Sequence, residues 1–157
     1  MARVNLGPFS LELPDGWTLT TLILAGPLDE VAQGQPSPQA IKPFQRNLVV
    51  TIEQLTERVS PENYIRRQLD GLRQAGVFRE TTRGPEKVSL AGGTSGTMME
   101  QVVASPSGEM VRQMQLVVMA DQDQGSLAYL LITSNLEGEP FEKVRDEFTK
   151  ILTSFAL

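Results

Sequence analysis

Apolar and polar residues alternate along several segments, and this pattern indicates a chain built mainly of β-strands. Residues 9–13 alternate with a period of two, and residues 14–16 then supply a turn before a second strand over residues 18–25. Residues 47–55 are rich in Val, Thr and Ile, which suit a pleated surface. Later strands are expected over residues 78–83, 87–90, 94–104, 110–120 and 126–134. Because short turns join these later strands, we expect an antiparallel meander.

Two helices complete the predicted fold. The first begins with Ser60 as its N-cap and Pro61 in the first helical position, carries an apolar stripe, and ends at Gly76 as its C-terminal cap. The second, over residues 140–155, places its phenylalanine and aliphatic side chains on one face. We therefore predict an α+β domain, in which two helices pack on one face of an antiparallel meander sheet.

A proline-rich segment over residues 26–46 separates two of the predicted strands. Its four prolines and two glycines cannot sustain a helix or sheet pairing, so we expect a long loop. Loops of this length are usually either functional or disordered, and both interpretations stay open. The remainder shows no domain boundary, and 157 residues suit a single domain spanning residues 1–157.

Methionine is concentrated in one predicted hairpin. Five of the six methionines lie on two apolar runs joined by a turn at residues 105–108, and they are Met98, Met99, Met110, Met114 and Met119. Methionine fills irregular gaps in cores and is also frequent on surfaces that accept several apolar partners. The hairpin is therefore either core or binding face.

Both faces of the central strands are expected to be covered, because residues 116–119 and 127–132 are apolar at consecutive positions. If both helices cover one face, the other must meet the long loop, a second subunit or a ligand. The alternative is that these strands are simply buried within the monomer. Gln113 and Gln115 interrupt the apolar hairpin on one face, and Arg112 lies on the other. The two amides suit the polar groups of a bound helix, or they are solvated strand positions.

Composition and charge exclude several classes of function. The chain has no cysteine and no histidine, which removes the commonest metal ligands and the commonest general base. A net charge of -5 without a basic cluster argues against nucleic acid as a partner. The apolar stretch over residues 17–28 is too short for a membrane span, and the first residues lack a signal-length apolar run. We expect a cytoplasmic protein without stable membrane insertion.

The sequence holds no convincing catalytic motif. Residues 91–96 are glycine-rich but lack the lysine of a phosphate-binding loop, and residues 121–125 lack the glutamate that completes a calcium loop. No serine has a partner base of the kind that a hydrolase triad needs. We predict that the protein is not an enzyme and that it needs no cofactor and no metal.

Several motifs, taken in order, resemble the DcrB-related family, which has a PsbP-like fold. They are residues 9–17 (FSLELPDGW), 47–51 (NLVVT), 64–72 (YIRRQLDGL), 88–92 (VSLAG), 111–115 (VRQMQ) and 148–155. Members of this length without a secretion signal are similar to the Eag-type adaptor chaperones of bacterial type VI secretion. The resemblance implies a homodimer that holds the apolar N-terminal transmembrane segments of PAAR-containing effectors before they are loaded on the VgrG spike.

The resemblance also suggests how such a chaperone would work. Apolar strands would replace lipid around the client helices, and side-chain amides would satisfy client polar groups. The candidate client-binding residues are Leu22, Leu24, Val49, Met99, Gln113, Gln115, Val117 and Met119. The opposite phase of the strands stays open. The proline-rich loop is longer than expected in a compact member of the family. It is either a lid over the binding groove or a sign that the protein belongs to another branch. The alternative function is a non-enzymatic PsbP-like scaffold, or a small-ligand or protein-binding domain, without a secretion client.

Overall fold

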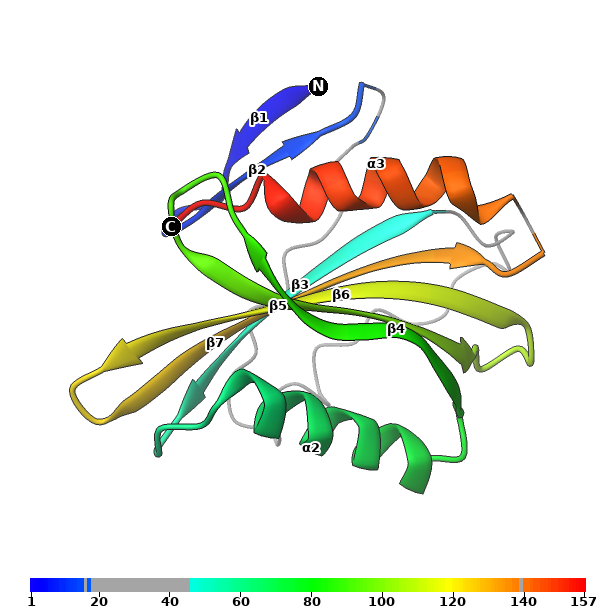
Figure 1. Ribbon diagram of the computed structural model, residues 1–157, viewed down its shortest axis with the longest axis horizontal. Coiled ribbons are helices and arrows are strands. Elements are labelled where there is room, and N and C mark those ends of the chain that lie inside the picture. Colours follow the sequence, from blue (N-terminus) through cyan, green and yellow to red (C-terminus); the bar gives the residue numbers. More distant parts are fainter. Residues whose placement is uncertain (16, 18–45, 139) are drawn as a thin grey trace.

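The computed structural model describes residues 1–15, 17, 46–138 and 140–157 (Figure 1). In this part of the chain the strands are β1 (Ala2–Asn5), β2 (Ser10–Leu13), β3 (Asn47–Leu55), β4 (Phe78–Ser89), β5 (Ser95–Ala104), β6 (Met110–Gln122) and β7 (Gly125–Leu136). The helices are α2 (Pro61–Gln74) and α3 (Phe141–Thr153).

The larger sheet has five strands in the order β3-β7-β6-β5-β4, and every neighbouring pair is antiparallel. Strands β4 to β7 follow one another as a meander, which confirms the prediction. The chain enters the sheet at its opposite edge, because β3 pairs with β7 over nine consecutive residues. Strands β1 and β2 form a separate two-stranded sheet.

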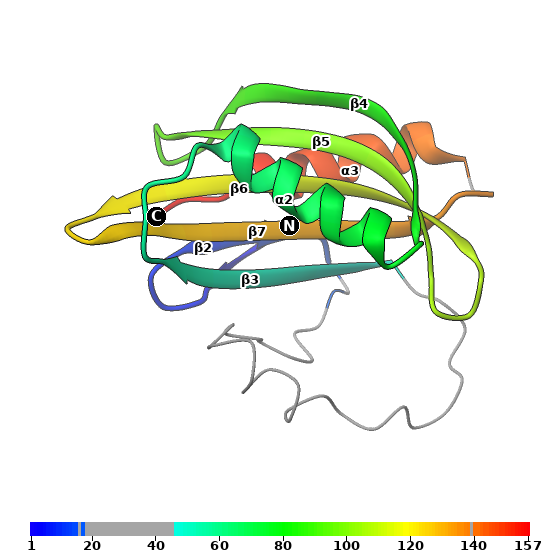
Figure 2. The same cartoon turned by 90° about the horizontal axis from the view of Figure 1, so that it is seen from below.

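The α+β class is confirmed, but the expected placement of both helices on one face needs correction. Figure 1 shows α3 on one side of the sheet and α2 on the other, and Figure 2 shows α2 crossing in front of the strands with α3 behind them. The physical reason is the run of apolar residues already noted in the central strands. Both of their faces are apolar, so each face needs a cover, and each helix supplies one.

The two faces carry separate apolar clusters. The larger cluster joins α3 and β2 to the sheet, and its side chains include Leu11, Leu116, Leu131, Phe148 and Phe155. The smaller cluster lies beneath α2 and consists of Val59, Tyr64, Ile65, Met99, Val117, Ala128 and Leu130, with partly buried neighbours. Consecutive residues of β6 alternate between the two clusters. The interpretation that the central strands are buried within the monomer is therefore confirmed.

The ends of α2 follow the sequence signals. The Ser60 hydroxyl accepts a hydrogen bond from the backbone N–H of Asn63 at 3.2 Å, and Pro61 occupies the first turn. After the last turn, Gly76 adopts a φ of 73°, a left-handed conformation that glycine reaches without a steric penalty. The predicted boundaries of this helix are confirmed.

Two strands differ from the expectation. Strand β4 runs through Gly84 and Pro85, where two strands were expected, because register shifts against β5 absorb the irregular residues. Strand β1 was not predicted, and it pairs with β2. The expected strand over residues 18–25 lies outside the described residues. The proline-rich loop over residues 26–46 also lies outside them, except for Arg46.

Candidate functional site

The methionine-rich hairpin does not form a single binding face. Met98 and Met114 belong to the cluster on the α3 side, whereas Met99 lies in the cluster beneath α2, with Met119 packed against it. Met110 is 39% exposed at the end of the hairpin. The methionines therefore act mainly as core residues, divided between the two faces of the sheet.

Neutral polar side chains form a row across the face that α2 covers. The Gln101 amide nitrogen donates a hydrogen bond to the Gln113 side-chain oxygen at 3.0 Å. The Gln113 amide nitrogen donates in turn to the Ser134 hydroxyl at 3.2 Å. The register places these three residues directly opposite one another on β5, β6 and β7. The row thus crosses the three central strands of the five-stranded sheet.

Part of the hydrogen-bonding capacity on this face is unused. The Gln101 side-chain oxygen is buried and has no hydrogen-bond partner among the described residues. The Gln115 amide nitrogen reaches only the Met99 sulfur, at 4.0 Å, and a thioether is a weak acceptor. A buried polar atom without a partner loses its bonds to water without replacing them. This face therefore holds donors and acceptors that the described part of the fold does not satisfy.

All six described candidate residues lie on the α2 face of the sheet. A single cross-strand row runs from Val49 through Ile132 and Gln115 to Met99. Of the candidates, Met99, Gln115 and Val117 are buried, Gln113 and Met119 are half-buried, and Val49 is 41% exposed. Leu22 and Leu24 lie outside the described residues. The chosen strand phase thus brings the candidates together, but three of them lie out of reach of a partner while α2 is in place.

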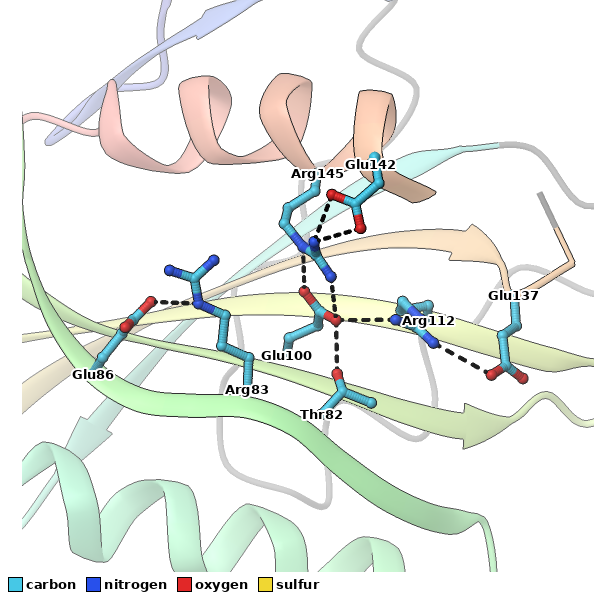
Figure 3. A network of polar contacts seen from close by, with 8 residues as sticks. All are labelled: Thr82, Arg83, Glu86, Glu100, Arg112, Glu137, Glu142 and Arg145. Atoms are coloured by element: carbon cyan, nitrogen blue, oxygen red, sulfur yellow. Dashed lines mark hydrogen bonds and ion pairs between the residues drawn. The ribbon is translucent and has the colours of Figure 1, made fainter. Parts of the chain in front are cut away.

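A charged network on the α3 side was not predicted from the sequence. The Glu100 side chain is only 2% exposed, yet it is a carboxylate in the middle of β5. Arg145 on α3 donates to it from Nε at 2.9 Å and from Nη2 at 3.2 Å (Figure 3). Arg112 on β6 donates at 3.2 Å and the Thr82 hydroxyl on β4 at 2.7 Å. Glu100 therefore joins three strands and a helix.

The surroundings of Glu100 keep it ionised. Burial alone raises the pKa of the Glu100 carboxyl, but the hydrogen bonds from Arg145 and Thr82 and the positive charges of Arg145 and Arg112 outweigh burial. The pKa of Glu100 consequently lies below its usual range. Both carboxylate oxygens already accept hydrogen bonds, so this group connects structural elements and is not available as a free base.

Each arginine of the network has further partners at its outer end. Arg145 donates to both oxygens of Glu142 at 2.9 Å, and Arg112 reaches Glu137 at 3.4 Å. Both guanidinium groups also lie over the Phe141 ring, 5.1 and 5.2 Å from its centroid. The start of α3 is therefore fixed by charge and by cation–π contact together.

One sequence signal could have revealed this network. On β5 the residues that face α3 are Met98, Glu100 and Val102, so a glutamate interrupts a buried apolar alternation. A carboxylate at such a position needs a cationic partner. The neighbouring strand offers Arg112, but no local rule identifies Arg145, which comes from a helix far along the chain.

The described residues offer no evident metal site and no membrane-crossing helix. In the part of the chain that the structure describes, no three Asp, Glu, His or Cys side chains converge closely enough to hold a metal ion. Neither α2 nor α3 is long and apolar enough to cross a bilayer, within the same described residues.

Comparison with known proteins adds one finding. No family model matches the chain, and no curated protein sequence matches it. The chain is similar to the crystal structure of LpqN of Mycobacterium tuberculosis, a protein described as involved in cell envelope biogenesis. The TM-score is 0.61 and the sequence identity 17%, over 99% of this chain and 88% of LpqN. The two proteins share a fold, and identity at this level shows the fold alone.

Proposed function

We propose that this chain is a non-enzymatic adaptor chaperone, which binds the apolar N-terminal transmembrane segment of a PAAR-type effector of type VI secretion. The proposal starts from the sequence resemblance to Eag-type chaperones of the DcrB-related family. The observation that carries it is a row of neutral polar side chains set in an apolar sheet surface. The row consists of the amides of Gln101 and Gln113 and the hydroxyl of Ser134, and the amide of Gln115 lies beside it. The chaperone would act in the cytoplasm, before the effector is loaded on the VgrG spike.

This combination of side chains fits a transmembrane helix. Such a helix is apolar along most of its surface and carries occasional hydroxyl or amide groups. An apolar protein surface removes it from water, and neutral amides satisfy its polar groups at a lower desolvation cost than charged residues would. The exposed Val49 marks the accessible end of this surface, because it shares a cross-strand row with Gln115 and Met99.

The family resemblance further implies a homodimer. Two copies would enclose a client from two sides, which a single sheet face does not do. A mass measurement on the free protein and on its client complex tests this part of the proposal directly.

A second function has its own supporting observation. Each sheet face is already covered by a helix of the same chain, as expected of a scaffold that needs no client. The fold shared with LpqN, whose description concerns cell envelope biogenesis, is compatible with such a role. The two functions differ in whether the chain keeps an apolar transmembrane segment in solution.

The decisive experiment is co-expression with the N-terminal transmembrane region of a PAAR effector from the same gene cluster, followed by purification without detergent. Val49→Glu introduces a charge on the proposed surface at an exposed position. Met110→Glu is the matched control, because Met110 is exposed to a similar extent (39% against 41%) but lies on the α3 face.

We expect the wild type and Met110→Glu to yield a soluble complex, and Val49→Glu to lose most of it while remaining folded. If the effector region stays insoluble with the wild type, the chaperone function is rejected in favour of the scaffold. If both variants retain the complex equally, the α2 face is the wrong surface.

A further inference from the structure

Helix α2 is held to the sheet by few buried side chains. Only Tyr64 and Ile65 of this helix are buried, and Leu69 is partly buried. The helix on the other face buries five, namely Phe141, Val144, Phe148, Ile151 and Leu152. Since the stabilisation of a surface helix comes mainly from packing of its apolar face, α2 is attached more weakly than α3.

The interior of α2 contains a glycine that packing does not require. A Cβ atom at Gly71 would meet no atom within 4 Å. Glycine in a helix interior lowers the stability of the helix, because it has more conformational freedom to lose on folding. The sequence therefore places a destabilising residue in α2, the helix that buries fewer side chains against the sheet.

The polar contacts of α2 lie along its edge with β3 and in solvent, and not over the middle of the sheet that it covers. The Tyr64 hydroxyl donates a hydrogen bond to Glu53 on the edge strand β3 at 2.9 Å, and Arg67 forms an exposed ion pair with Glu57 at 2.7 Å. Among the described residues, α2 provides no hydrogen bond to Gln101 or Gln115 on the face that it covers. Helix and sheet are therefore matched in their apolar groups and at the Tyr64–Glu53 contact on the edge strand, but not at Gln101 and Gln115.

We infer that α2 occupies the client surface in the free protein, and that an apolar client helix with neutral hydroxyl or amide side chains takes its place. Such a helix replaces the modest apolar contact of α2 and also supplies partners for the Gln101 oxygen and the Gln115 amide. This explains how the buried candidates Met99, Gln115 and Val117 become accessible. The inference rests on the proposed function, since it names the partner and the mode of access at the same surface.

The test uses single cysteines, which the natural chain lacks. Val117 and Val118 are neighbours on β6 and are 0% and 1% exposed, but Val117 lies beneath α2 and Val118 in the cluster on the α3 side. Val117→Cys and Val118→Cys are therefore matched in residue type, strand and burial. The rate at which a thiol reagent labels each folded variant reports how often its face opens.

We expect Val117→Cys to be labelled at least about tenfold faster than Val118→Cys, because local opening is more frequent where fewer apolar contacts are made. Adding Gly71→Ala to Val117→Cys should slow labelling about fivefold, since alanine favours the helix by about 1 kcal/mol. It should leave Val118→Cys unchanged. Ala128→Cys, also buried beneath α2, serves as a second probe if Val117→Cys does not fold.

The second part of the experiment repeats the labelling on each variant after it has been co-purified with the transmembrane segment of the PAAR effector. Protection of Val117→Cys in the complex supports the inference. Equal and slow labelling of the two cysteines in the free protein overturns it, and so does a soluble complex in which Val117→Cys is labelled at its free rate. If Val117→Cys opens readily but no complex forms, the proposed function fails while the opening of α2 stands.

Discussion

Arg145 on α3 donates two hydrogen bonds to Glu100 on β5, with Nε 2.9 Å from one carboxylate oxygen and Nη2 3.2 Å from the other. This two-point contact fixes the orientation of the guanidinium group as well as its position. Because Arg112 and Thr82 bond the same carboxylate, α3 is connected to β4, β5 and β6 through a single side chain. Figure 3 shows the three donors arranged around Glu100.

Glu100→Gln should destabilise the fold by about 2–3 kcal/mol, because it removes the buried anion that two partly buried guanidinium groups share and leaves them only their outer partners Glu137 and Glu142. The control is Glu142→Gln, which removes another partner of Arg145 at a position that is 86% exposed. We expect the control to change the free energy of unfolding by less than about 1 kcal/mol. Urea denaturation measures both, and equal effects would show that Glu100 is not the centre of the network.

The same carboxylate predicts a pH dependence. The pKa of Glu100 is lower in the folded state than in the unfolded chain, so its contribution to stability is complete above the usual carboxyl pKa of about 4.3. That contribution is lost as the pH falls through the lowered folded-state pKa. The stability difference between wild type and Glu100→Gln should therefore shrink as the pH is lowered from about 5 through the acidic range. Urea midpoints measured across this range check the prediction, and a constant difference would contradict it.

Much of the fold was predictable because it depends on local signals. The cap at Ser60, the glycine at Gly76 and the turn at residues 105–108 all act on neighbouring residues, and the structure has each of them in the expected role. The face on which a helix packs is not a local property. Two apolar sheet faces and two amphipathic helices allow more than one arrangement, and only the complete chain decides between them.

Gly71→Ala should raise the free energy of unfolding by about 0.5–1 kcal/mol, because the position is helical and open around the missing Cβ. Gly76→Ala is the matched control, since this position is equally open but has a φ of 73°. There an alanine is strained, and we expect a loss of about 1 kcal/mol. Thermal unfolding distinguishes the two variants, which should shift in opposite directions.

Tyr64→Phe should weaken the attachment of α2 by about 1 kcal/mol, because it removes the hydrogen bond from the hydroxyl to Glu53 and keeps the ring in place. Tyr129→Phe is the comparison, as its hydroxyl forms no hydrogen bond with the described residues and its ring packs with Phe9 and Phe155. Urea denaturation should show a measurable loss for Tyr64→Phe and little change for Tyr129→Phe. Similar losses would mean that the contact with Glu53 contributes nothing.

The candidate surface was predictable only in part. The alternation along β6 correctly placed Gln113, Gln115, Val117 and Met119 on one face, since side chains two residues apart on a strand point the same way. Their burial was not predictable, because it depends on α2, whose position is a tertiary property. The unpartnered Gln101 oxygen was also missed, since hydrogen-bond satisfaction requires coordinates rather than a pattern.

The cluster on the α3 side draws on both ends of the chain. Phe9 stacks on Phe155, and the backbones of Ser10 and Ala156 exchange two hydrogen bonds at 2.8 and 3.1 Å. During translation, Phe9 leaves the ribosome long before its partner has been synthesised. The nascent chain must therefore hold this aromatic surface uncovered until Phe155 has also left the ribosome, so this half of the core closes only after the intervening strands and helices have been synthesised.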